Sequence, residues 1–194
     1  MKNCSKPDRI GLSFKWKAFS LFNILLFGSI LVTILCSTFL LPPSAYWVNQ
    51  QPFNKNIASS VGWTDFLNIF LHNFALAVLI ATLPGIVFFP LSIGSLIYTG
   101  ISNGIAAYPL TGWQFVVTLP TLVLEGEGLV VAALAGTVLG VSWLAPSWLF
   151  TEEQLSKTDT FKRTCKNCLK ICLLAVAIFL IAAIVETTTM VMFP

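Results

Sequence analysis

The chain has 194 residues, of which 56% are hydrophobic and only 10% are charged. Because soluble globular domains carry about 25% charged residues, this composition excludes an ordinary soluble domain and predicts a single integral membrane domain over residues 1–194. The net charge of +3 comes from basic residues outside the apolar runs, a pattern typical of membrane orientation signals and not of nucleic-acid binding.

Five apolar stretches predict an all-α, polytopic membrane protein with five transmembrane helices. A helix needs about 20 mostly apolar residues to cross ~30 Å of hydrocarbon. In chain order we expect spans at residues 18–41, 65–89, 91–108, 118–145 and 168–193. The first is interpreted as an uncleaved helix, because its apolar run exceeds the ~7–15 residues of a signal-peptide core. Pro84-Gly85 interrupts the second, and the third follows almost without a loop.

The fourth span contains the segment LPTLVLEGEGLVVAALAGTVLG, residues 119–140. Pro120 and the glycines at 126 and 128 weaken its first third as helix. We therefore expect a broken or re-entrant segment at its start, followed by a regular helix. Irregular backbone at membrane depth is tolerated only beside protein or a water-filled cavity.

Small residues recur at every fourth position of this span, at Gly128, Ala132, Gly136 and Gly140. On a helix they share one face, and such a face lets two backbones approach closely within a membrane. Two interpretations remain open: packing against another helix of the same chain, or an interface between subunits.

The basic residues predict the orientation. Five precede the first span, and four lie in the polar segment 146–167. Because cytoplasmic segments are enriched in Lys and Arg, both regions are expected in the cytoplasm. Three crossings between the loop after span one and segment 146–167 agree with that rule. The prediction is a prokaryotic cell membrane with the N-terminus cytoplasmic and the C-terminus outside.

Carboxylic acids behave differently from basic residues, because Glu125, Glu127 and Glu186 all lie inside apolar runs. A charged side chain in mid-membrane costs ~2.5–3.5 kcal/mol on insertion scales. These acids therefore need a proton, water or a bound cation. The alternative is a structural role, with a protonated acid capping backbone groups at the broken helix.

Other polar groups fall in the second and third spans, at His72, Asn73 and Asn103. We predict that they join Glu125, Glu127 and Glu186 in one polar pocket or transport path, with Glu125 at its centre. For His72, a hydrogen bond between helices is the other interpretation.

The fourth span resembles the most recognisable segment of the stage II sporulation protein M (SpoIIM-like) family, which reads L-P-H-G-x-x-E, an apolar run and G-x-x-x-G. Leu119, Pro120, Glu125, Gly136 and Gly140 keep that spacing here.

Further positions extend the resemblance to about residues 60–194. Asn73, Asn103-Gly104 and Glu186 match polar family positions, whereas Thr121-Leu122 replaces the family's His-Gly. His72 is then a candidate to replace the missing histidine. The resemblance implies an integral membrane protein that acts with partners. The sporulation member resembles a scaffold that works with cell-wall hydrolases. Related proteins occur in circular-bacteriocin gene clusters, linked to maturation, export or immunity.

Two functions remain open. The first is a non-enzymatic membrane subunit or scaffold of an envelope, export or maturation complex. The second is an ion- or proton-linked transporter or channel that works as a homo-oligomer, with Glu125 lining the path. No P-loop, G-x-S-x-G or H-E-x-x-H motif indicates an enzyme. The expected partners are the lipid bilayer and other membrane proteins or further copies of this chain.

No cofactor or metal is expected. The segment CKNCLKIC places Cys165, Cys168 and Cys172 near the start of span five. A structural zinc site takes four ligands, and no second Cys/His pair is nearby. Free thiols and acylation remain open for these cysteines.

Overall fold

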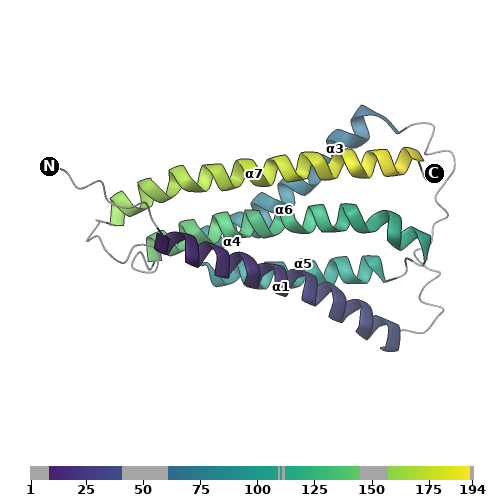
Figure 1. Ribbon diagram of the computed structural model, residues 1–194, viewed down its shortest axis with the longest axis horizontal. Helices are drawn as coiled ribbons and strands as arrows, with labels where there is room; N and C mark the ends of the chain where they lie inside the picture. The colour runs from purple at the N-terminus through teal and green to yellow at the C-terminus, as the bar shows by residue number, and fades with distance from the viewer. Residues whose placement is uncertain (1–8, 41–60, 109, 111, 145–156, 193–194) are drawn as a thin grey trace.

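The computed structural model describes residues 9–40, 61–108, 110, 112–144 and 157–192. In these residues every regular element is helical. The elements are α1 (Arg9–Leu40), α3 (Trp63–Leu76), η2 (Ala77–Thr82), α4 (Leu83–Val87), α5 (Pro90–Ala107), α6 (Trp113–Leu144) and α7 (Lys157–Met192). They form an elongated bundle (Figure 1). Residues 41, 145 and 193, at predicted span ends, and residues 146–156 of the basic segment lie outside the described residues.

Helices occur at all five predicted positions, but in the described chain four of them, not the predicted five, are both long and apolar enough to be candidate membrane spans. The four stretches are Phe14–Leu40, Trp63–Val87, Trp113–Leu144 and Phe161–Met192. The predicted third span corresponds to the 18 residues of α5. Three serines, a threonine and Asn103 within α5 lower its apolarity. At 1.5 Å per residue it is still about 27 Å long, and it returns the chain along the bundle (Figure 1).

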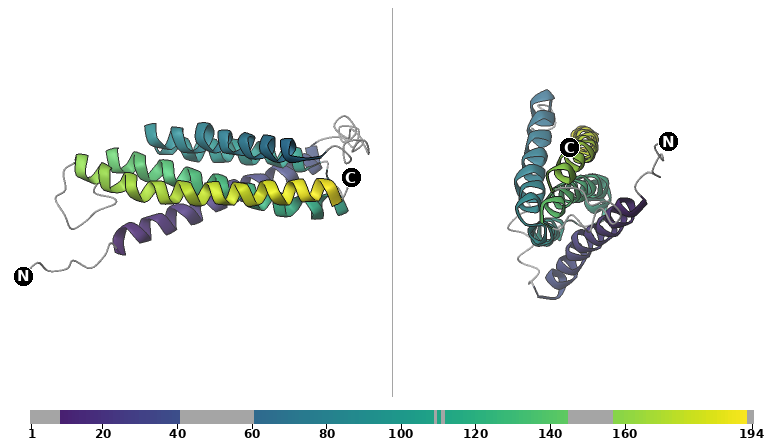
Figure 2. Two further views of the ribbon diagram at one scale, coloured as in Figure 1. Left: turned by 90° about the horizontal axis from the view of Figure 1, so that it is seen from above. Right: turned by 90° about the vertical axis from the view of Figure 1, so that its left-hand side faces the viewer.

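The centre of the bundle is α6. Of its apolar stretch 67% is buried, against 12–28% in the other three candidate spans, so α6 is surrounded by protein where they face outward. It packs most extensively against α7 and also contacts α1, η2, α4 and α5. Figure 2 shows α1 and α3 on opposite sides of the α6–α7 pair. Most side chains of α6 therefore contact other helices of the chain.

The expected break at the start of span four is not there. α6 is one continuous helix that includes Pro120, and the irregular backbone lies in span two, where residues 77–82 form a π-helix. The N–H of Leu83 bonds the carbonyl of Val78, five residues back. Pro84 explains the widened turn, because proline lacks an N–H and its ring crowds the carbonyl four residues earlier. The Ser92 hydroxyl donates to the Ala81 carbonyl at 3.2 Å and satisfies one backbone group there.

The small-residue face of α6 packs within the chain. Gly136 lies against the backbone of Thr82, and Gly140 lies against the carbonyl of Gly85. Between them and Gly128, the Ala132 carbonyl accepts a hydrogen bond from the Thr82 hydroxyl at 3.2 Å. Gly128 itself faces α7, where an added Cβ would lie 2.6 Å from the Phe179 ring. The face thus holds the irregular part of span two against the central helix.

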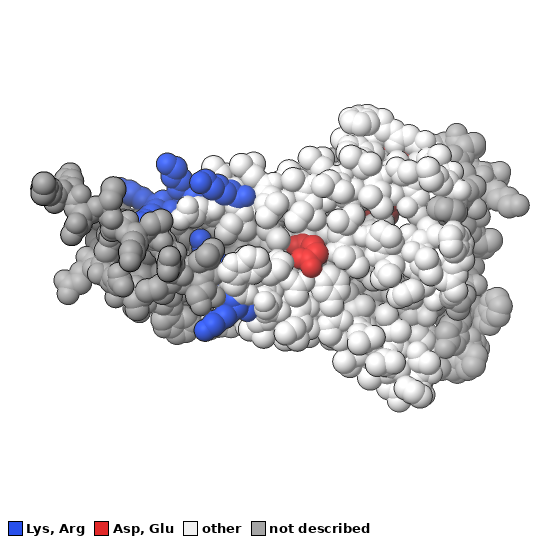
Figure 3. Space-filling model, in the orientation of Figure 1, with Lys and Arg blue, Asp and Glu red and all other residues white. Residues whose placement is uncertain are grey.

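The basic residues gather at one end of the bundle. Figure 3 shows Lys and Arg side chains near the end where α1 and α7 begin, and an acidic group exposed near the middle of that face, which is otherwise almost entirely uncharged. α6 ends and α4 turns into α5 at this same end, and α7 ends at the opposite one (Figure 1). The helix directions therefore place the starts of α1 and α7 together.

Candidate functional site

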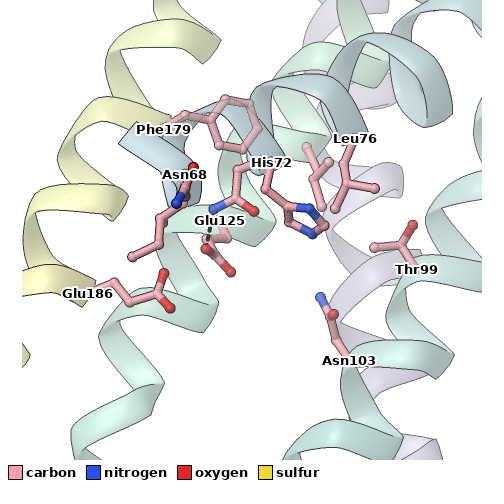
Figure 4. Close-up of a pocket in the computed structure, with 11 residues that line it drawn as sticks. Asn68, His72, Leu76, Thr99, Asn103, Glu125, Phe179 and Glu186 are labelled. Carbon is pink, nitrogen blue, oxygen red and sulfur yellow. Dashed lines mark hydrogen bonds between the residues drawn. The ribbon is translucent and has the colours of Figure 1, made fainter. Parts of the chain in front are cut away.

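A polar pocket of about 410 Å³ lies between α3, α5, α6 and α7. Figure 4 shows side chains from all four helices turned towards it. Its lining is Asn68, Ile69, His72, Asn73, Leu76, Thr99, Asn103, Glu125, Leu129, Phe179 and Glu186. Five of the six predicted polar-pocket residues line it, and they come from four separate helices.

Glu125 is the central acid of the pocket. The side-chain amide of Asn73 donates a short hydrogen bond to its Oε1, as the dashed line in Figure 4 shows. Asn73 is only 8% exposed, so this bond is shielded from the surroundings of the bundle. Because α3 packs on α7 beside α6, the side-chain amide of Asn73 lies next to the carboxyl group of Glu125. This contact joins residues 52 positions apart and fixes the orientation of the carboxyl group.

Glu186 brings a second carboxyl group to the same place. It lies on α7 and lines the same pocket, with its carboxyl group close enough to that of Glu125 for the two to interact. Two carboxyl groups at this separation repel each other when both are ionised, so the pair needs a shared proton or a cation between its oxygens. The site can therefore bind positive charge.

The pocket reaches the surface on the α3 side. His72 and Asn68 are exposed, four residues apart on one face of α3, whereas Asn103 and Thr99 are half-buried on α5. α3 makes no extensive contact with α5 in the described chain, so the lining between these two helices is not sealed. The opening is thus on the flank of the bundle.

A second cavity of about 190 Å³ adjoins the first. It shares Asn103 and Glu125 with the larger pocket and extends past Phe115 and Leu119 at the beginning of α6. Glu125 therefore lies between two cavities, one polar and one mainly apolar.

Glu127 does not join the pocket, contrary to its predicted place there. Positions 125 and 127 differ by about 200° on a regular helix, and α6 is regular here. Glu127 is directed to α1, where it lies beside Asn23, whose side-chain amide donates to the Phe19 carbonyl at 3.1 Å. The predicted sharing of one face required an extended or broken segment, which α6 lacks.

A comparison with protein families decides the assignment. The family described as Stage II sporulation protein M matches residues 18–189, nearly the whole chain. The chain belongs to this family. No curated protein and no solved structure matches it. Family membership and the four apolar helices together indicate an integral membrane protein, and the family is not a known enzyme family.

The family resemblance and the geometry converge on the same side chains. Glu125, Asn73, Asn103 and Glu186, the polar residues on which the resemblance in the sequence rested, all line the one pocket. His72 lines it too, although it is exposed and lies outside the replaced His-Gly position.

Two polar contributors were missed from sequence. Thr99 lines the pocket four residues before Asn103, and that spacing on one helix face was the available signal. Asn23, the neighbour of Glu127, lies alone in the first span, where nothing in the sequence indicates its contact.

The cysteines of α7 lie away from the pocket. The Cys168 thiol is buried and donates to the Ala135 carbonyl at 2.8 Å, which ties α7 to α6. Among the described residues, no three His, Cys, Asp or Glu side chains are grouped as metal ligands.

Proposed function

We propose that the protein is a non-enzymatic membrane subunit of an envelope, export or maturation complex. One observation carries this proposal: the polar pocket opens on the flank of an otherwise apolar bundle. His72 and Asn68 are exposed there, while Leu67 and Leu71 of the same helix are exposed on its apolar side. Polar groups without hydrogen-bond partners in hydrocarbon cost several kcal/mol each, so another chain or water has to cover this opening.

The pocket also has a rigid frame, which suits a docking site. Its α3 wall continues into η2 and α4, and these pack closely on the small-residue face of α6. Its other wall, α5, is held to α1 by the close contacts of Gly100 with Ser29 and of Gly104 with Thr33. A preformed site loses little conformational entropy when a partner binds.

In the proposed orientation α5 also crosses the membrane. The basic starts of α1 and α7 then face the cytoplasm, and the end of α7 lies outside. The apolar residues that α5 exposes, including Leu91, Tyr98 and Ile105, support this placement.

Site-specific photocrosslinking tests the subunit function. A photoreactive phenylalanine analogue at position 72 should capture one membrane protein in native membranes, at a yield near one partner per chain. The matched control is position 173 on α7, where Leu173 is 61% exposed but lies outside the pocket lining. The same products at both positions, or no protein adduct at position 72, would contradict the proposal.

Ion- or proton-linked transport by a homo-oligomer is the second candidate. The observation in its favour is the position of Glu125 between two adjoining cavities. Purified protein in liposomes would then carry a cation or proton current that Glu125→Gln abolishes and Glu127→Gln leaves unchanged. In that case position 72 should crosslink to a further copy of this chain or to none.

A further inference from the structure

We propose that the pocket binds a basic side chain, Lys or Arg, from the transmembrane helix of a different protein. The inference rests on the proposed subunit function and specifies the chemistry of the partner. It assigns Glu125 and Glu186 as the pair that receives the ammonium or guanidinium group.

Charge is the first reason. Neither carboxyl group forms an ion pair with a Lys or Arg of the described helices; Glu125 receives the Asn73 amide, and Glu186 interacts with Glu125. The exposed His72 is the one other titratable group of the lining, and it faces Glu125 only. A carboxylate without a counter-charge in a membrane is unfavourable by ~2.5–3.5 kcal/mol or more. A cation between the two carboxylates removes that penalty, and a basic residue in a partner's span has the same need. Each partner then supplies the charge that the other lacks.

Size is the second reason. Liquid water occupies about 30 Å³ per molecule, so a pocket of about 410 Å³ has room for roughly a dozen waters. A single bare metal ion would leave most of this volume empty. A long side chain with a charged end fills it better.

The lining matches such a side chain along its length. In Figure 4 the two acids and Asn103 lie on one side of the pocket, and Leu76 and Phe179 lie on the other. Leu129 is a third apolar residue of the lining. Lys and Arg carry an apolar stem below a charged head, so they can contact both kinds of surface. Thr99 and Asn103 offer further oxygen acceptors for N–H groups that the carboxylates leave free.

The source of the cation follows from this chain's own charges. Its described Lys and Arg residues lie in the basic stretches that begin α1 and α7, gathered at one end of the bundle (Figure 3). A second copy in the same orientation therefore offers no basic residue at the depth of Glu125. Because the opening is on the flank between α3 and α5, the partner helix has to approach within the membrane. The partner is thus a different chain with one Lys or Arg well inside a span.

A model helix tests the contact without knowledge of the partner. The full chain in lipid nanodiscs is titrated with a fluorescent Leu-Ala transmembrane peptide that carries one central Lys, and energy transfer to an acceptor dye on the chain reports binding. A peptide with Leu in place of Lys is the control. We expect the Lys peptide to bind at least about tenfold more tightly. Glu125→Gln and Glu186→Gln should each reduce that difference, and Glu127→Gln should preserve it.

Several outcomes would overturn the inference. Equal binding of the two peptides to the unmodified chain does so without any substitution, so a misfolded variant cannot decide the result. A loss with Glu127→Gln as large as with Glu125→Gln would show a general effect of charge. In native membranes, capture of a partner at position 72 that persists undiminished in Glu125→Gln overturns the cationic contact but leaves the subunit function standing. Preferential Lys-peptide binding without any captured partner supports the contact and contradicts the subunit function.

Discussion

Replacement of Gly136 by alanine should destabilise the protein. A Cβ at this position would overlap the carbonyl oxygen of Thr82 and lie 2.9 Å from the carbonyl carbon and Cα of the same residue. All three atoms belong to the backbone of η2, so the two helices have to move apart. Such overpacking costs about 1–3 kcal/mol. Alanine recovers about 0.5–1 kcal/mol relative to glycine inside a helix, which leaves a net loss of up to about 2.5 kcal/mol.

Gly94→Ala is the matched control with the opposite expected sign. Gly94 is also inside a helix, α5, but an added Cβ meets nothing within 4 Å. Only the helix-propensity gain of about 0.5–1 kcal/mol then acts. For a chain of this size 1 kcal/mol shifts the melting temperature by about 2–4 °C. Gly136→Ala should therefore melt up to about 10 °C lower than the unmodified chain, and Gly94→Ala about 1–4 °C higher.

Both shifts are measured by heating the purified protein in mild detergent to a series of temperatures. The fraction that remains monodisperse at each temperature gives the melting temperature. Equal melting temperatures for Gly136→Ala and Gly94→Ala would refute the reasoning, because the two changes differ only in what the added methyl group meets. The experiment thus tests whether the small-residue face of α6 closes on η2.

Three further changes test the orientation and the pocket. A reporter fused after Pro194 should be external and one inserted near Thr158 cytoplasmic. The reverse arrangement would mean that α5 does not cross, and the same side for both would mean that α7 does not cross. Asn73→Leu removes the donor to the Glu125 carboxyl and should lower stability by about 1–3 kcal/mol, because a buried acceptor loses its partner; a melting temperature at the unmodified value would deny that the bond matters. Glu125→Gln keeps the shape of the side chain and should leave the melting temperature within about 2 °C, whereas Glu125→Leu should lower it further than Asn73→Leu. Equal melting temperatures for Glu125→Gln and Glu125→Leu would show that the polar pocket does not contribute to the stability of the fold.

Helix positions were predictable from sequence because apolarity and length determine them in a membrane. All five expected segments are helices, with bounds within a few residues at most ends. The count of spans was less predictable. α5 carries polar residues as well as an apolar face. Because α5 packs against α1 and α6, it can be accommodated in the bundle although its average apolarity is low.

The sequence allowed us to predict which polar residues form the pocket, but not how they are arranged in space. Glu125, Asn73, Asn103 and Glu186 are polar residues in apolar runs, and the high free energy of exposing such groups to lipid indicates that they meet. Sequence cannot show which side of a helix faces which neighbour. For that reason Glu127 was placed with Glu125, although helical geometry directs it to Asn23 on α1.

The misplaced break has a physical explanation. Pro120 and the glycines of α6 lower its intrinsic helix propensity, but propensity is a weak influence where tertiary packing is extensive, and α6 is packed on nearly all sides. In span two, Pro84 is followed by a glycine that has to approach the backbone of residues 136 and 137. The widened turn at residues 77–82 accommodates Pro84. The close contact of Gly85 with α6 follows in α4. Two acids can therefore occupy a regular helix because that helix is central. Glu125 lies between α3 and α7 and is bonded by Asn73, whereas Glu127 is only half-buried beside α1. The irregular backbone lies in span two, which packs against α6.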